Sequence, residues 1–191
     1  MKHSLRKEMK AVLAAMTPQA VGRKSHLACA HLTAMDEFRA AGVVMAYLPM
    51  PEEVDTTAVI LAAWQAGKTV LAPKVSWEHK HMMSMEFHSL DTGLVLTRQG
   101  PKLLEPEYGE AWPAEEIDFV IVPALAFDAN GNRLGRGMGF YDRFLVGCSK
   151  AFTCGLAFAE QVVQRVPTSN HDRPVAALVT DQKMYRFNEQ H

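Results

Sequence analysis

The 191-residue sequence has little cysteine, no strong excess of either charge and no long apolar run. Its three cysteines, Cys29, Cys148 and Cys154, are odd in number and show no C-x-x-C spacing, which argues against a disulfide framework and a zinc ribbon. We interpret them as reduced thiols that fill the core. Twenty Lys and Arg against 21 Asp and Glu leave a formal net charge of -1, so the bulk positive field of a protein that coats nucleic acid is absent.

Signals for secretion or membrane insertion are also missing. The stretch MKHSLRKEMKAVLAAM alternates charges with short apolar steps and lacks the apolar run, roughly 7 to 15 residues long, of a signal peptide. No later segment approaches the length of a membrane span. We therefore expect a cytoplasmic protein with no membrane partner. Its composition, 48% hydrophobic and 21% charged, is typical of a globular protein, and we expect residues 1–191 to form one α/β domain.

Helical periodicity dominates the amino end. Leu5, Met9 and Leu13 recur at helical spacing. Thr17 and Pro18 then form an N-cap followed by proline at the first helical position, a pattern that favours the start of a second helix. The sequence therefore predicts two helices before residue 36.

The next segment has the pattern of a crossover unit. Residues 43–50 (VVMAYLPM) and residues 69–75 (TVLAPKV) are short apolar runs rich in β formers. Between them, Asp55 or Thr56 caps an expected helix that Gly67 closes. A strand, a helix and a strand within about thirty residues are typical of a parallel crossover, so the pattern predicts an α/β sandwich.

The remainder of the chain contains further extended segments and one long connection. Residues 117–127 (IDFVIVPALAF) have the most pronounced pattern of a buried strand. Residues 89–114 are rich in Gly, Pro and Glu and are expected to form a surface loop. Other strands are expected over residues 82–88, 152–159 and 175–180.

The stretch GNRLGRGMGFYDRF, residues 131–144, leads from the expected strand 117–127 into a segment with helical character. Its glycines at positions 135, 137 and 139 allow backbone angles that other residues avoid, and they let amide N–H groups approach a ligand. The positive end of the following helix favours an anion. The stretch is therefore a candidate phosphate-binding loop.

Charged residues in this loop support the same hypothesis. Arg133 and Arg136 offer forked donors to phosphate oxygens, and a Mg²⁺ ion carried by a polyphosphate would explain Asp142 beside them. The spacing of the glycines differs from the dinucleotide fingerprint, and no G-K-[ST] of a Walker loop follows. A plain glycine-rich turn with solvated arginines is the alternative.

An RNA-binding function competes for the same residues. RGMGFY nearly matches the octapeptide K/R-G-F/Y-G/A-F-V-x-F/Y of one RNA-binding module. Met138 and Arg143 stand where that octapeptide needs aromatic residues, and it needs a strand where the flanks here favour a loop and a helix. We therefore disfavour this function and expect no nucleic-acid partner.

A family resemblance covers most of the chain. VPALAFDANGNRLGRGMGFYDRFL resembles the signature of the 5-formyltetrahydrofolate cyclo-ligase family, also called methenyltetrahydrofolate synthetases. KHSLR is similar to the family's K-x-x-x-R opening, YLPMPEEVDT to its strand-loop segment and VPTSNHDRPVAALVTD to its carboxyl end. These segments follow one another in family order.

The resemblance implies a three-layer α/β/α sandwich with a mostly parallel sheet, related to the folds of sugar-phosphate isomerases and coenzyme A transferases. It implies an enzyme that uses ATP and Mg²⁺ to convert 5-formyltetrahydrofolate into 5,10-methenyltetrahydrofolate. The formyl oxygen would attack the γ-phosphate, N10 would close the ring and phosphate would leave. The expected partners are these small molecules, and the expected state is a monomer.

The resemblance also implies site residues. ATP would be bound by Lys2, Arg6, Arg133, Leu134, Gly135, Arg136, Gly137, Met138, Gly139, Phe140 and Tyr141. The folate would be bound by Leu48, Glu53, Arg136, Gly137, Met138, Gly139 and Phe140. The catalytic residues would be Arg136 and Tyr141, and the Mg²⁺ ligands Asp142 and Asp172.

Each of these residues has a plainer structural interpretation. Lys2 and Arg6 share one face of the first helix, which is equally the pattern of a solvated face. Glu53 follows an expected parallel strand, where open α/β sheets place ligands, yet it also fits an acidic helix start. Asp172 fits a turn or a helix cap.

The sequence departs from the family pattern at three places. Met138 stands where a lysine is common, and Phe140 stands where a tyrosine is common. The YGIPEP-like loop before the long strand is represented only by KLLEPEYG. A divergent relative that binds ATP or a phosphorylated metabolite without ring closure is therefore the second hypothesis.

Overall fold

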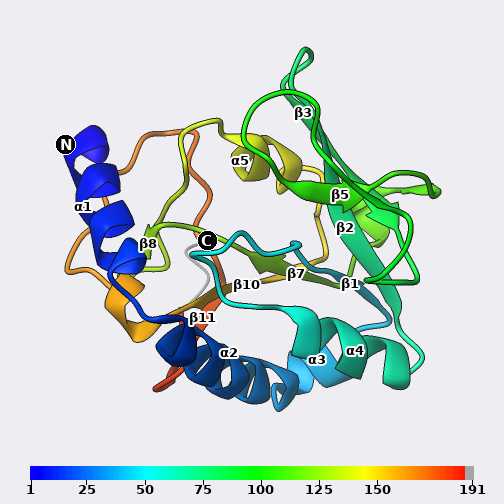
Figure 1. Cartoon of the computed structure of the whole chain (residues 1–191), viewed down its shortest axis with the longest axis horizontal. Helices are drawn as coiled ribbons and strands as arrows, with labels where there is room; N and C mark the ends of the chain where they lie inside the picture. Colours follow the sequence, from blue (N-terminus) through cyan, green and yellow to red (C-terminus); the bar gives the residue numbers. More distant parts are fainter. Residues whose placement is uncertain (188–191) are drawn as a thin grey trace.

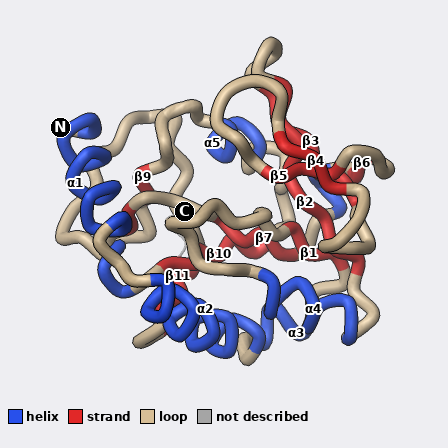
Figure 2. The backbone as a smooth tube through the Cα atoms, viewed as in Figure 1, coloured by secondary structure: helices blue, strands red, loops and turns tan. Residues whose placement is uncertain are grey.

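The computed structural model describes residues 1–187 and contains a central eight-stranded sheet in the order β12-β11-β10-β7-β1-β2-β3-β6 (Figures 1 and 2). The α-helices are α1 (Lys2–Ala14), α2 (Pro18–Thr33), α3 (Asp36–Ala40), α4 (Thr57–Gln65) and α5 (Phe140–Phe144). The strands of this sheet are β1 (Val43–Met45), β2 (Thr69–Ser76), β3 (His81–Glu86), β6 (Ala111–Trp112), β7 (Phe119–Val122), β10 (Phe152–Ala157), β11 (Ala177–Thr180) and β12 (Met184–Arg186).

The middle of the sheet is parallel. β11, β10, β7, β1 and β2 pair in parallel, whereas β12 and β3 run antiparallel to their inner neighbours. Every residue of β7 and of β11 is buried, as expected for strands that are covered on both faces. The prediction of a mostly parallel α/β sheet is confirmed.

Helices and loops cover the two faces unequally. α2, α3 and α4 lie on one face, where Leu32, Val59 and Ile60 join a large apolar core (Figure 1). On the other face the cover consists of the short α5 and neighbouring loops, with Phe127 and Phe144 packed against the sheet. This thinner layer leaves space for a cavity beside α5.

The predicted amino-terminal helices and the crossover unit are confirmed. Thr17 caps α2 by accepting a hydrogen bond from the backbone N–H of Ala20 at 3.2 Å. β1 pairs in parallel with β2 after the intervening α4. The backbone N–H of Thr57 at the start of α4 donates to Asp55 at 2.9 Å, and Gly67 follows the helix with φ of 71°.

The expectation of one continuous strand over residues 117–127 is wrong. The segment divides at Pro123 into β7 and a second strand, β8 (Ala126–Phe127). Proline has no backbone N–H to give to a sheet ladder, so the chain leaves the central sheet there. β8 then pairs antiparallel with β9 (Arg133–Leu134), which brings the glycine-rich stretch back over the sheet.

Two other expectations need correction. The strand expected over residues 43–50 ends at Met45, and the following residues form a loop above the sheet. Residues 89–114 are more ordered than a surface loop, because they contain β6 and a separate hairpin of β4 (Leu94–Leu96) and β5 (Leu104–Pro106). Strands of two or three residues are too short to show a period in the sequence.

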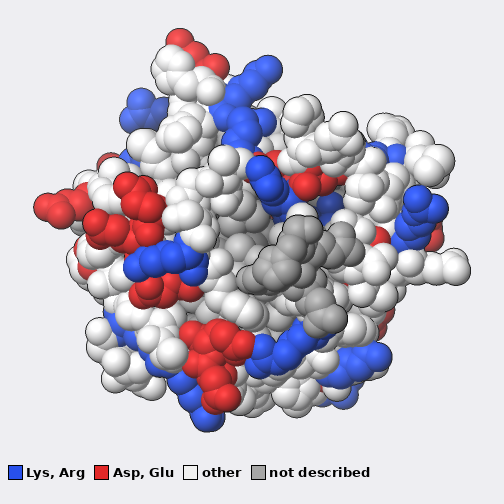
Figure 3. All heavy atoms as spheres, turned by 180° about the vertical axis from the view of Figure 1, so that it is seen from behind, with Lys and Arg blue, Asp and Glu red and all other residues white. Residues whose placement is uncertain are grey.

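The surface agrees with the balanced composition. Figure 3 shows basic and acidic side chains interspersed over the face opposite to the view of Figure 1. All three cysteines are buried, as predicted for thiols that fill the core. Within residues 1–187, none of the helices has the length and apolar character needed to cross a membrane.

Candidate active site

A cavity of about 750 Å³ opens at the carboxyl ends of the parallel strands β1 and β7. Tyr47 and Leu48 line it from the segment after β1, and Pro123 and Ala124 line it from the break after β7. Ligands of open α/β sheets bind in this position, because the loops that follow parallel strands meet at one edge. The glycine-rich stretch forms another wall.

The glycines of this wall have backbone conformations that side chains rarely adopt. Gly137 has φ of 111° and Gly139 has φ of 65°. Arg6 of α1 lies directly against this loop, since its Nε donates to the carbonyl of Gly135 at 3.0 Å. A Cβ atom added to Gly137 would lie 3.4 Å from the Arg6 guanidinium carbon, which is an ordinary van der Waals distance. The requirement for glycine at positions 137 and 139 therefore comes from the backbone conformation of the loop and not from its contact with α1.

The structure brings together cations that lie far apart in the sequence. Lys2 and Arg6 reach the cavity from α1, and Arg133 and Arg136 reach it from the glycine-rich wall. The side chain of Arg133 is only 3% exposed, and its Nη2 donates to Asp142 at 2.6 Å. Burial lowers the pKa of the Arg133 guanidinium, although the negative charge of Asp142 opposes this effect.

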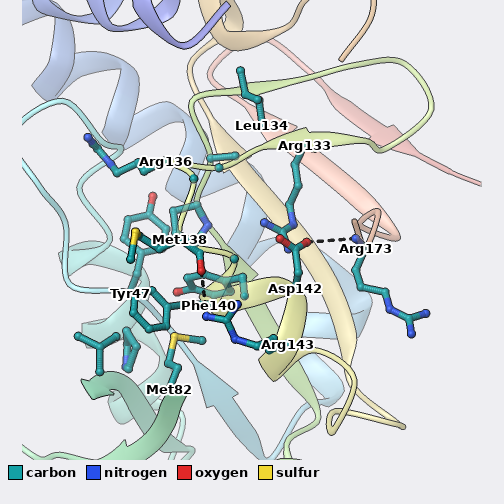
Figure 4. A pocket seen from close by; sticks show the side chains of 18 of the residues that line it. Tyr47, Met82, Arg133, Leu134, Arg136, Met138, Phe140, Asp142, Arg143 and Arg173 are labelled. Atoms are coloured by element: carbon teal, nitrogen blue, oxygen red, sulfur yellow. Dashed lines mark hydrogen bonds and ion pairs between the residues drawn. The ribbon is translucent and has the colours of Figure 1, made fainter. Parts of the chain in front are cut away.

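Two carboxylates lie among these cations. Asp142 Oδ1 accepts hydrogen bonds from Arg133 and from the backbone N–H of Arg173 (Figure 4). Asp172 pairs with Lys2 at 2.5 Å and accepts from the backbone N–H of Ser169. Burial alone would raise the pKa of Asp172, but the hydrogen bonds from Lys2 and Ser169 together with the charges of Lys2 and Arg133 outweigh it and hold this pKa below its ordinary value.

The donor set fits a Mg²⁺ ion only if a ligand supplies most of the coordination. In residues 1–187 no group of three or more His, Cys, Asp or Glu side chains is placed to hold a metal. Both hydrogen bonds that Asp142 accepts in the described chain use Oδ1, which leaves Oδ2 as a ligand. One or two carboxylates together with phosphate oxygens are typical of Mg²⁺ sites on nucleotides.

Glu53, in the loop after β1, is a largely buried carboxylate that also lines the cavity. It accepts a hydrogen bond from the backbone N–H of Met50 at 3.0 Å and lies 3.4 Å from Arg136. Burial raises the pKa of the Glu53 carboxyl, and these bonds only partly oppose the shift. Glu52, its more exposed neighbour, lies 3.3 Å from the same guanidinium.

Several buried polar atoms around the cavity have no hydrogen-bond partner in the described part of the chain. They are Trp77 Nε1, Arg133 Nε, Arg136 Nε and the Tyr141 hydroxyl. Burial also raises the pKa of Tyr141, so this hydroxyl keeps its proton and remains a donor. Buried polar groups in native proteins are nearly always paired. Four such atoms around one cavity indicate that a ligand supplies the missing partners.

All predicted site residues line this one cavity. They are Lys2, Arg6, Leu48, Glu53, Arg133, Leu134, Gly135, Arg136, Gly137, Met138, Gly139, Phe140, Tyr141, Asp142 and Asp172. Sequence reasoning missed a second, apolar group of lining residues, namely Tyr47, Trp77, Pro101, Leu103 and Leu104, which lies beside Met82. The signal was weak because these residues come from separate strands and a hairpin, and each alone has the pattern of ordinary core.

The fold and this cavity define an α/β protein with a ligand site that joins a cationic glycine-rich wall to an apolar flank. The chain belongs to the 5-formyltetrahydrofolate cyclo-ligase family, whose family model matches residues 1–181. The resemblance stated from the sequence motifs is therefore confirmed, and the protein is an enzyme of this kind.

Individual relatives agree with this assignment. The chain is 31% identical over 183 residues to the 5-formyltetrahydrofolate cyclo-ligase of Mus musculus, with 91% of this chain and 90% of the mouse protein covered. It is 30% identical over 178 residues to that of Escherichia coli K12, with 91% and 96% covered. Its structure matches that of Aquifex aeolicus 5,10-methenyltetrahydrofolate synthetase with a TM-score of 0.86 and 31% identity, over 100% of this chain and 94% of the other.

Glu53→Gln should stabilise the protein at high pH. Because burial raises the pKa of Glu53 above its unfolded value of 4.5, the stability that this carboxyl contributes is present below 4.5 and is lost as the pH rises through the folded pKa. A glutamine removes this loss. In urea unfolding, the variant should therefore have a larger free energy of unfolding than the wild type at about pH 8, and this difference should shrink toward about pH 4.5.

Glu52→Gln is the matched control, since this side chain is 44% exposed and contacts the same arginine. It should leave the pH dependence of the unfolding free energy close to that of the wild type. Equal pH profiles for the two variants would show that Glu53 does not carry a desolvated charge.

Proposed function

We propose that this enzyme converts 5-formyltetrahydrofolate into 5,10-methenyltetrahydrofolate in a reaction that depends on ATP and Mg²⁺. The observation that carries the proposal is the composition of one cavity. A polyphosphate requires cations and hydrogen-bond donors. The cavity has them in Lys2 and Arg6 of α1, in Arg133 and Arg136 of the glycine-rich wall, and in donors that lack a partner within the described residues. The same cavity holds the carboxylate of Glu53 and an apolar flank.

The chemistry explains why the cavity needs no protein nucleophile. The formyl group on N5 is an amide, so its oxygen is a poor leaving group. That oxygen attacks the γ-phosphorus of ATP, and the bond from this phosphorus to the β-γ bridging oxygen breaks to release ADP. N10 then attacks the formyl carbon, loses its proton to water, and phosphate departs with the former formyl oxygen. Such transfers depend on positioning and on neutralising charge.

The cationic wall is proposed to hold ATP. Lys2 and Arg6 reach the phosphates from α1, and the residues from Arg133 to Tyr141, Leu134 included, surround them with backbone N–H groups and guanidinium donors. In catalysis, Arg136 stabilises the charge that develops at the transferring phosphoryl group. Tyr141 donates the proton of its unpaired hydroxyl as a hydrogen bond to the same oxygens.

The opposite side is proposed to hold the folate. Glu53 accepts hydrogen bonds from the amino-pyrimidine edge of the pterin, and Leu48 packs against its face. Arg136 and the segment from Gly137 to Phe140 contact the formyl end, where the two substrates meet. The short distance between Arg136 and Glu53 supports this arrangement, since a folate bound by Glu53 would lie beside phosphates bound by Arg136.

Mg²⁺ is proposed to be held by Asp142, with Asp172 as a second carboxylate. When bound, it would neutralise charge on the phosphate oxygens of ATP. Asp142 also orients Arg133, and Asp172 orients Lys2, so each carboxylate places one cation on the wall. We further propose that the chain forms one domain, which the single eight-stranded sheet supports, and that the enzyme acts as a monomer.

The direct experiment is a near-ultraviolet absorbance time course with the purified protein, 5-formyltetrahydrofolate and Mg²⁺, with and without ATP. The expected result is a rise from the conjugated methenyl product that requires both ATP and Mg²⁺. A folded protein that binds ATP and gives no rise would instead support the second hypothesis, a divergent relative without ring closure.

Arg6→Ala should raise the KM for ATP about tenfold or more, because hydrogen bonds between charged groups contribute about 1.5 to 3 kcal/mol. Steady-state kinetics with saturating folate measures the change. Lys10→Ala is the control, since Lys10 lies one turn further along the same helix and is exposed. Similar ATP KM values for the two variants would contradict the role of Arg6.

Met138→Lys tests the departure from the family pattern. Met138 lines the cavity and is 44% exposed, so a lysine there adds a partly solvated cation beside the phosphates. The KM for ATP should fall by about two- to fivefold, the range expected of an exposed charge pair. Met83→Lys, on an exposed residue away from the cavity, should change nothing. A rise in the ATP KM for Met138→Lys would place the phosphates elsewhere.

A further inference from the structure

Trp77 lies in the turn after β2 and lines the apolar flank of the cavity. Its indole meets Phe140 edge to face, with ring centroids 5.1 Å apart and planes at 89°. Gly100, from the hairpin between β4 and β5, approaches the same ring so closely that an added Cβ would lie 2.6 Å from it. The indole is therefore fixed between the start of α5 and the hairpin of β4 and β5, which are distant in the sequence.

The hairpin that contacts Trp77 is anchored to β2. Lys74 Nζ donates to the carbonyls of Pro106 and Glu107 at 2.9 and 2.8 Å. The backbone N–H of Val75 donates to the Glu105 carboxylate at 3.2 Å. These bonds hold the hairpin as the outer wall of the apolar flank, with Pro101 and neighbouring residues on the cavity.

The indole nitrogen of Trp77 is buried and has no hydrogen-bond partner within residues 1–187. Trp64 and Trp112 have the same property, but neither of them lines the cavity. An unpaired indole nitrogen alone therefore assigns nothing. The combination of an unpaired N–H, a place on the cavity wall and a ring that cannot swing away distinguishes Trp77.

We propose that Trp77 is a specificity-determining residue that binds the aryl-amide part of the folate. Its ring packs against the benzoyl ring, and Nε1–H donates to the amide carbonyl that joins this ring to the glutamate. The inference rests on the proposed function, which supplies the folate. Figure 4 shows Tyr47, Met82 and Phe140 on one side and Arg133 with Asp142 on the other, with Arg143 beside Phe140. The apolar side chains of the first side favour the uncharged aryl group there.

Adenine shares the relevant chemistry, because it too is a flat ring with hydrogen-bond acceptors. The first test therefore measures both substrates. Trp77→Phe keeps an aromatic ring and removes the N–H, so the KM for 5-formyltetrahydrofolate should rise about three- to tenfold, the usual effect of one lost hydrogen bond, with the ATP KM within about twofold. Trp112→Phe, the control outside the cavity, should leave both KM values within about twofold.

A second measurement keeps Trp77 in place. In the variant that combines Trp64→Phe with Trp112→Phe, Trp77 is the one remaining tryptophan, since the chain has three. Its fluorescence should be quenched saturably by 5-formyltetrahydrofolate without ATP, and ATP alone should have little effect. Trp77→Phe, titrated identically, should lose this saturable component and show only the light absorption of the folate.

The outcomes separate this contact from the reaction itself. An unchanged folate KM in Trp77→Phe, a rise in the ATP KM alone, or no saturable quenching would overturn the contact while ring closure by the wild type stands. Saturable quenching in a wild-type protein that gives no methenyl product would support the contact and reject the proposed reaction.

Discussion

The ion pair between Arg133 and Asp142 is the interaction on which the arrangement of the site depends. Arg133 begins the short strand β9 and Asp142 lies in the first turn of α5, so their bond closes the glycine-rich segment between them into a ring. Burial of the guanidinium is costly, and the carboxylate only partly compensates it. Arg133 Nε stays unpaired in the described chain, so the site holds a polar group that a ligand can satisfy.

The rest of the site is assembled around this ring. Arg6 contacts the ring at Gly135 and Gly137, so α1 is attached to the cavity by a side chain instead of by apolar packing alone. Arg136, from the same ring, reaches across to Glu53 in the loop after β1. Segments from both ends of the sequence therefore meet where the parallel strands end. Ion pairs and hydrogen bonds of arginine side chains fix the glycine-rich loop, which has little regular secondary structure.

Sequence reasoning recovered the parts of the fold that local periodicity specifies. The α4 crossover was predictable because Thr56, Gly67 and the two apolar runs all lie within one short segment. The break at Pro123 was missed because the residues on both sides are apolar and buried, so the pattern stays that of one strand. The contact of Trp77 with Gly100 depends on how a hairpin folds back on β2, which no local pattern encodes.

The pairing of charges in the cavity has a consequence for how a ligand is attracted. Six cations line the cavity, namely Lys2, Arg6, Arg133, Arg136, Arg143 and Arg173, against four carboxylates, namely Glu53, Glu105, Asp142 and Asp172. Three of these cations are in direct ion pairs, Lys2 with Asp172, Arg133 with Asp142 and Arg136 with Glu53. Opposite charges this close largely cancel at a distance, so the field that the cavity projects into the solvent is that of about two positive charges instead of six. A polyanion therefore gains much of its affinity after entry, by exchanging partners with these carboxylates. Capture should depend less on ionic strength than six cations would suggest.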